Sequence, residues 1–139
     1  KKAAFVYNFT TLVSWPPNKS EFFIIGVLGH SHISSFLNKF AAGKFIGGKK
    51  VIIMPLHSVD TYCHILFVGK DQQKQFQKIK KSIATKPTLI ITENVYLNEI
   101  GGHISFYIDK SKVSFLVNKY AIEKHGLLVS ASLMSFSGQ

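Results

Sequence analysis

The sequence predicts a single α/β domain with a mixed, mostly parallel sheet flanked by helices and a C-terminal antiparallel hairpin. A length of 139 residues and an apolar content of 46% suit one packed core. Over the first two thirds of the chain, short apolar runs alternate with amphipathic helical segments, as in βαβ units. Near residue 110, two strand-like runs flank a short polar segment. The chain shows no internal repeat or low-complexity tract, so residues 1–139 are expected to form one domain.

The first half of the chain is expected to alternate between helix and strand. Apolar residues at helical spacing predict a helix over residues 3–13, which ends before two consecutive prolines. The apolar run 22–28 predicts a strand that is buried on both faces. A second helix is expected to follow Ser31, its predicted N-cap, because four apolar residues recur at helical spacing: Ile33, Phe36, Leu37 and Phe40.

The middle of the chain predicts strands over 51–56 and 64–68, then a helix opened by Asp71 and a strand over 88–92. This helix is predicted to bury three residues: Phe76, Ile79 and Ile83. The glycine-rich segment 43–48 is followed by two lysines, which raises the question of a phosphate-binding loop. Such a loop joins a strand to a helix N-terminus, whereas this segment leaves a helix and enters a strand. We therefore interpret it as a connection.

The last third changes character. The runs 104–108 and 113–117 flank a polar tetrapeptide, as the arms of an antiparallel hairpin would. Asn118 is expected to cap a helix that ends at Gly126. The tail after Gly126 mixes β-branched residues, serines and apolar residues, so the sequence leaves strand and helix both open there.

The chain is strongly basic, with a net charge of +10 from 17 basic residues against 7 acidic ones. Every basic residue is a lysine. Arginine is the usual residue for bidentate recognition of phosphates and guanine edges, so a specific nucleic-acid reader without one would be unusual. No apolar stretch approaches the length of a membrane-spanning helix, so the chain is not expected to span a membrane. It starts at Lys1 without a signal peptide, and the termini leave export open.

The six histidines lack the spacing of a metal site. His30 and His32 lie in a turn without a nearby carboxylate, and we interpret them as a surface pair. Cys63 and His64 are neighbours on a strand, so they point to opposite faces and are not expected to share an ion or a proton. Cys63 is interpreted as a small buried hydrophobe, with a redox role as the alternative. The acidic residues are too dispersed for a catalytic pair. We expect a non-enzymatic binding protein without metal or cofactor.

Trp15 is the aromatic residue singled out for recognition. It stands between a helix end and two prolines, where a large ring can be partly exposed. Core packing is the alternative to a recognition role. The hypothesis is that Trp15 contacts a partner together with the aromatic face of the first helix, formed by Phe5 and Phe9.

Short motifs occur in a fixed order along nearly the whole chain. They are Lys2–Phe9 with Trp15-Pro16, Val27-Leu28-Gly29, Gly47-Gly48-Lys49, Cys63–Phe67, Gly101–Ile104, Val113–Asn118, Ala121, Gly126-Leu127 and Ser130–Met134. Each motif is weak, but their order and spacing together resemble the YfiR-like proteins, an exported bacterial family.

This resemblance implies a periplasmic domain with a mixed sheet flanked by helices, often dimeric, with no catalytic activity known to the family. Its best-understood members bind the periplasmic sensor region of a membrane-bound diguanylate cyclase and restrain it, which lowers cyclic di-GMP and biofilm formation. The expected function is therefore that of a periplasmic regulator of a membrane signalling protein. The alternative is a ligand-sensing module, associated with a sensor kinase, that binds a small molecule or cell-wall fragment beside the strand ends.

One departure from the family concerns redox control. Members studied as redox-responsive repressors carry paired cysteines, whereas this chain has one cysteine, Cys63, in the motif before the His-Ile-Leu-Phe strand. An intramolecular disulfide switch therefore does not carry over, and intermolecular pairing of Cys63 stays open.

Overall fold

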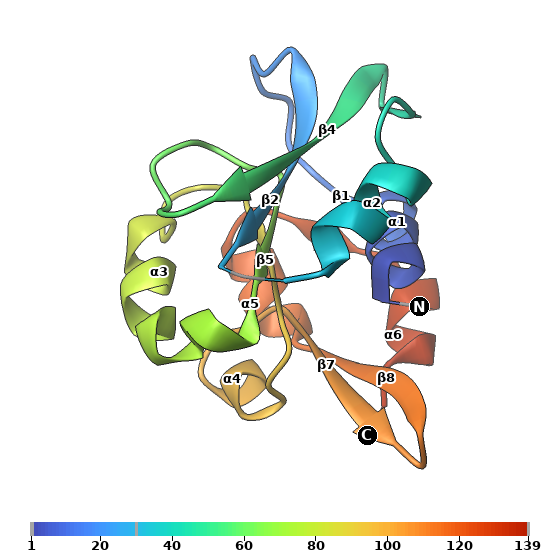
Figure 1. Ribbon diagram of the computed structural model, residues 1–139, viewed down its shortest axis with the longest axis vertical. Coiled ribbons are helices and arrows are strands. Elements are labelled where there is room, and N and C mark those ends of the chain that lie inside the picture. Colours follow the sequence, from blue (N-terminus) through green and yellow to red (C-terminus); the bar gives the residue numbers. More distant parts are fainter. Residues whose placement is uncertain (1, 30, 139) are drawn as a thin grey trace.

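A computed structural model describes residues 2–29 and 31–138 as a sheet between two groups of helices (Figure 1). Its helices are α1 (Lys2–Leu12), α2 (Ile33–Phe40), the 3₁₀ helix η1 (Lys70–Gln75), α3 (Phe76–Ser82), α4 (Tyr96–Glu99), α5 (Lys119–Lys124) and α6 (Ala131–Phe136). Its strands are β1 (Val13–Ser14), β2 (Phe22–Leu28), β3 (Phe45–Ile46), β4 (Lys49–Leu56), β5 (Ile65–Val68), β6 (Leu89–Thr92), β7 (Ile104–Asp109), β8 (Lys112–Val117) and β9 (Leu128–Val129).

Within the described residues, seven strands form the main sheet in the order β3-β4-β2-β5-β6-β7-β8. The five central strands, β4 to β7 in this order, are parallel, and β3 and β8 pair antiparallel at the two edges. The predicted mixed, mostly parallel sheet with a C-terminal hairpin is thereby confirmed. A small second sheet, formed by β1 and β9, was not expected from the sequence.

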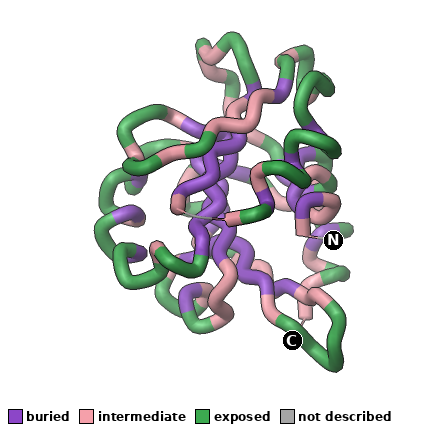
Figure 2. Tube along the Cα trace, viewed as in Figure 1, coloured by how far each residue is buried: buried purple, intermediate pink, exposed green. Residues whose placement is uncertain are grey.

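The two faces of the sheet carry separate hydrophobic cores. Helices α1, α2, α5 and α6 cover one face, where their apolar residues pack against inward residues of the strands such as Ile25 and Phe67. Helices α3 and α4 cover part of the other face, against residues such as Leu66 and Ile90. Figure 2 shows the result, with β5 and β6 buried along their length. These strands are apolar except for Thr92, because both of their faces are covered.

The connection from β4 to β5 is unusually short for two parallel strands. They lie on either side of β2, yet residues 57–64 join them without a helix in the described chain. A crossover between parallel strands normally contains a dozen or more residues, most often a helix that covers the sheet. Here that helix is missing, and the second face of β2 and β4 lacks the cover that α3 gives to β5 and β6.

Several sequence-based expectations need correction. Helix α2 buries Ile33 and Leu37, but Phe36 and Phe40 are 51% and 44% exposed, so its predicted apolar face is only half used. The helix expected from Asp71 begins as the 3₁₀ turn η1 and becomes α-helical at Phe76. The first helix ends at Leu12, one residue early, because the next two residues pair with β9.

The predicted turns are confirmed, but the N-cap of α2 is His32, whose side chain makes no capping hydrogen bond. The predicted N-cap, Ser31, accepts a hydrogen bond through its Oγ from the Ile33 backbone N–H at 3.2 Å. Asn118 accepts a hydrogen bond from the Ala121 backbone N–H at 3.1 Å and so caps α5, which ends before Gly126 at a φ of +82°. The segment 43–48 is part of a β3–β4 hairpin, as expected for a connection. The undecided tail contains both elements, β9 and then α6. Of the expected surface pair His30 and His32, His30 lies outside the described residues.

Candidate partner-binding site

Trp15 lies directly after β1 and is half-buried. Its indole Nε1–H donates a hydrogen bond to the backbone carbonyl of His64 at 2.8 Å. Its ring packs edge-on against Phe23, with 5.1 Å between ring centroids. The remaining surface of the indole forms one wall of a cleft of about 530 Å³, which Ile46 and Lys49 also line. One side of the ring therefore packs on the core and the other faces a cleft, and the recognition role of Trp15 stays a prediction.

The polar groups of this cleft hold one another in place. Lys49 Nζ donates to the side-chain and backbone oxygens of Asn18 at 2.7 and 3.2 Å. His64 is 1% exposed, and its Nδ1 accepts a hydrogen bond from the Ile24 backbone N–H at 3.1 Å. Burial, and secondarily the charge of Lys49, lowers the pKa of His64 to about 4. Because this imidazole is neutral and its Nδ1 lone pair is occupied, His64 serves the structure and is a poor general base.

Phe5 and Phe9 belong to an aromatic cluster between α1 and the β7–β8 hairpin. Phe9 packs edge-on against Phe115 at 5.1 Å, and Phe5 does so at 5.5 Å. Phe9 is only 1% exposed, so its ring packs mainly within this cluster. Phe5 is half-buried and lines a groove of about 420 Å³ together with Leu12 and Phe136. This groove and the Trp15 cleft share no lining residue, so the structure does not bring Phe5 and Trp15 together.

Cys63 is a buried, protonated thiol. It is 2% exposed, and its Sγ lies 3.7 Å from the backbone oxygen of Thr61. An ideal Cβ placed on Gly26 would lie 2.6 Å from this sulfur, so the thiol occupies the space that a side chain at Gly26 would need. Burial raises the pKa of the Cys63 thiol to about 11. Since the thiolate is the reactive form, these surroundings favour the interpretation of Cys63 as a small hydrophobe.

The buried His103 and the half-buried His125 form a pair that the sequence analysis did not single out. His103 is fully buried, its Nδ1 accepts from the Ile90 backbone N–H at 2.9 Å, and its ring meets that of His125 edge-on at 4.7 Å. Among the described residues, His103 Nε2 and His125 Nδ1 have no hydrogen-bond partner. Burial lowers the pKa of both imidazoles, that of His103 to about 3. The described part of the chain contains no group of three or more ligating side chains around them or elsewhere.

Replacing Trp15 tests how much of the ring belongs to the core. We expect Trp15→Ala to lower the free energy of unfolding by about 2 kcal/mol, because it removes packing against Phe23 and the hydrogen bond to His64. Trp15→Phe keeps most of the ring, so we expect a loss of about 1 kcal/mol. Urea unfolding followed by circular dichroism measures both. If Trp15→Ala were as stable as the parent, the packing of Trp15 on the core would contribute nothing to stability, and the whole ring would be available for recognition.

These features define an α/β domain with surface clefts, in which His64, His103 and Cys63 serve the structure. Such a domain suits the binding of a partner or a ligand. The family model of YfiR/HmsC-like proteins matches residues 1–137, and the chain belongs to this family. The family is regulatory and non-catalytic, which makes the chain a signalling regulator by descent. No curated protein matches the chain. None of the helices in the described residues is long and apolar enough to cross a bilayer.

Proposed function

We propose that this protein is a periplasmic regulator that binds the periplasmic region of a membrane-bound diguanylate cyclase and restrains it. The observation that carries this proposal is the match to the YfiR/HmsC-like family over residues 1–137. In this proposal the protein acts by association and not by catalysis. Trp15 and the half-buried ring of Phe5 are candidate contacts, and Phe9 supports Phe5 from the core.

Deletion of the gene tests this function. We expect cellular cyclic di-GMP to rise several-fold in the deletion strain, and to return to the parental level when the exported protein is supplied in trans. The physical reason is mass action, because a restraining partner holds the cyclase in its inactive state only while it is bound. Mass spectrometry of the nucleotide in parent, deletion and complemented strains measures this, with expression in the parent confirmed. An unchanged level in the deletion strain would refute restraint of a cyclase.

A ligand-sensing function is the second candidate, and the cleft beside Trp15 favours it. Its volume of about 530 Å³ suits a small molecule, and its lining combines aromatic rings with the ammonium group of Lys49. Such a ligand would stabilise the fold by mass action. A thermal-shift screen of small molecules and cell-wall fragments checks this function, and a screen without a stabilising compound would count against it.

A further inference from the structure

The missing crossover helix leaves one part of the sheet without a helical layer. The register pairs Phe22 with Lys50 and Lys50 with Phe45, so these three side chains lie on the same face across β2, β4 and β3. Along the strands, every second residue points to this face. It therefore carries six apolar residues, which we call the open face: Phe22, Ile24, Phe45, Ile52, Met54 and Leu56.

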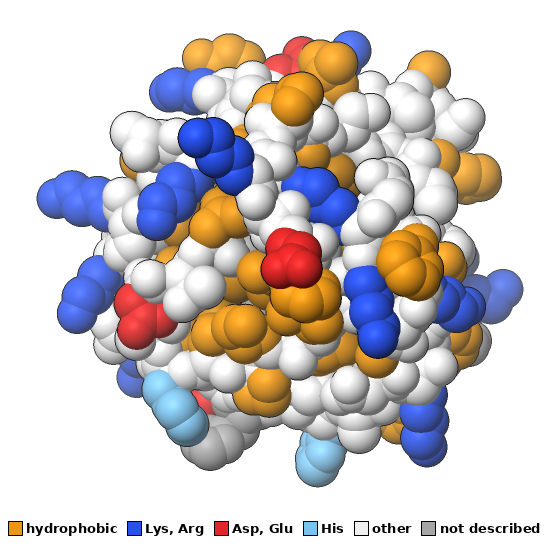
Figure 3. Space-filling model, turned by 90° about the horizontal axis from the view of Figure 1, so that it is seen from above, with side chains coloured by type: hydrophobic (Ala, Val, Ile, Leu, Met, Phe, Trp, Pro, Cys, Tyr) orange, Lys and Arg blue, Asp and Glu red, His pale blue; other side chains and the backbone are white. Residues whose placement is uncertain are grey.

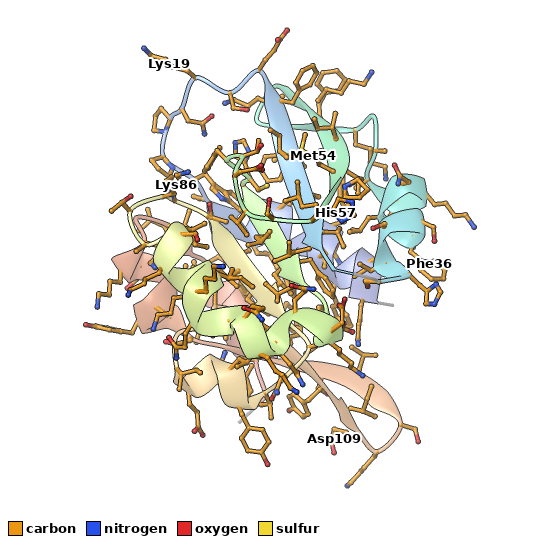
Figure 4. All side chains as sticks on the ribbon, turned by 60° about the vertical axis from the view of Figure 1, so that its left-hand side comes forward. Lys19, Phe36, Met54, His57, Lys86 and Asp109 are labelled. Atoms are coloured by element: carbon orange, nitrogen blue, oxygen red, sulfur yellow. The ribbon has the colours of Figure 1, made fainter. Side chains whose placement is uncertain are left out.

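The open face is poorly covered by the chain's own side chains. Phe22 is 37% exposed and Phe45 is 66% exposed, while Ile24, Ile52 and Met54 are half-buried. None of these five residues is part of, or packed against, either hydrophobic core of the described chain. In Figure 4, Met54 lies on the stretch of sheet above α3 that no helix covers. From above, Figure 3 shows hydrophobic side chains gathered over this end of the molecule, with lysines around them.

The lower border of the open face is fixed by the short β4–β5 connection. Cys63, at the end of that connection, packs on Gly26, and Leu56 approaches the same glycine. Leu56 is the one member of the open face that also contacts the second core. The connection does not cover the rest of the open face, so the exposed part of the open face extends from Met54 to Phe45. Contiguous exposed apolar areas of this kind mark interaction sites on soluble proteins.

The charges around the open face indicate what kind of partner fits. Lys50 pairs with both Phe22 and Phe45 on this face. At its border, Lys86 and Asp60 both lie close enough to Cys63 to influence the pKa of that thiol. Among the described residues, the one salt bridge is between Lys2 and Glu93, so Lys50 is not neutralised by a described ion pair. The chain carries a net charge of +10, so this face favours a partner that presents acidic residues.

We propose that the open face docks an amphipathic helix of the regulated cyclase, with its apolar side on Phe22, Ile52 and Met54 and acidic residues beside Lys50. A helix is the occupant because helices are what cover the faces of parallel sheets. This proposal rests on the proposed function and names the open face as the surface that binds the cyclase.

The experiment measures binding between purified proteins by calorimetry. The ligand is the periplasmic region of the diguanylate cyclase whose activity rises on deletion of the gene. We expect Met54→Glu and Phe45→Glu each to weaken binding at least 10-fold, because a carboxylate would be buried against apolar surface. Lys50→Glu is expected to weaken binding about 10-fold and to reduce its dependence on salt. Phe45 is so exposed that its replacement leaves the melting temperature unchanged, which guards against a variant that merely misfolds.

Two control variants separate the open face from other surfaces. Phe36→Glu changes an exposed ring on α2, on the opposite face of the sheet, and is expected to bind like the parent. Thr11→Glu changes an exposed residue of the Trp15 cleft, the other candidate contact, and we expect it to weaken binding less than Met54→Glu does. If Thr11→Glu weakens binding while Met54→Glu does not, the partner docks at the Trp15 cleft and the open-face proposal is wrong.

The remaining outcomes distinguish this proposal from the proposed function. If the parent protein does not bind the periplasmic region at all, the proposed function fails, and the docking proposal fails with it. If the parent binds and the three open-face variants bind equally well, only the docking proposal fails. If sedimentation shows a dimer of the parent that Met54→Glu dissociates, the occupant is a second copy, which also overturns the proposal.

Discussion

Acidification from pH 7 to pH 4 is expected to lower the free energy of unfolding on the order of 2 to 3 kcal/mol for each of two buried histidines. His103 and His64 are neutral in the folded protein, with pKa values lowered to about 3 and about 4 from the ordinary value of 6.5. The unfolded chain binds protons at these imidazoles below pH 6.5, whereas the folded chain does not. Stability therefore decreases as the pH falls from 6.5, until the folded pKa values are reached.

The variant His103→Asn isolates one of these contributions. The side-chain oxygen of asparagine can accept the hydrogen bond from the Ile90 N–H in place of Nδ1, but it does not titrate. We expect this variant to be less stable than the parent at pH 7 and to lose less stability between pH 7 and pH 4. Urea unfolding at a series of pH values measures the slopes. Equal slopes for His103→Asn and the parent would contradict the assignment.

Replacement of Gly26 by alanine is expected to destabilise the protein by about 2 to 3 kcal/mol. The new Cβ would lie 2.6 Å from Cys63 Sγ and 2.8 Å from Leu56 Cδ1, so the side chains of the β4–β5 connection would have to move. Removal of the sulfur by Cys63→Ala makes room for that methyl group. We therefore expect the double variant to be more stable than the sum of the two single changes, by about 1 to 2 kcal/mol. A double-mutant cycle from urea unfolding curves measures this coupling.

Gly102 provides the matched control for this cycle. A Cβ there would lie 2.8 Å from the backbone oxygen of Leu97, a clash that no change at Cys63 can relieve. Gly102→Ala should destabilise the protein and show no coupling to Cys63→Ala. If the effects of Gly26→Ala and Cys63→Ala on the free energy of unfolding were additive, the thiol would not be what limits the space beside Gly26.

The elements that the sequence predicted correctly are those whose pattern is local. Strands β5 and β6 are continuous apolar runs, and the capping side chain of Asn118 lies within a few residues of the helix it begins. The burial of Cys63 followed from its place before an apolar strand. In each case the residues that define the element are neighbours in the chain, so periodicity and turn chemistry were sufficient.

The features that the sequence did not predict depend on distant partners. The strands β1 and β9 have two residues each, too few for a periodic pattern, and they exist because Val13 pairs with Val129. The contact between His103 and His125 joins two different elements. Phe36 has the spacing of a core residue, yet the sheet beneath α2 is already filled by Ile33 and Leu37. The open face could be recognised only when the register showed which side chains lie together.

The pairing of β1 with β9 also determines when the chain can finish folding. Helix α1 buries Phe9 against Phe115 and packs close to α6, so the first helix completes its core with residues from the last quarter of the chain. Closing so long a loop is slow, because its entropy is lost before the contacts form. During synthesis the aromatic face of α1 must therefore wait, solvent-exposed, until the final segment has been made. A chaperone that recognises exposed apolar helices would therefore bind this protein at α1.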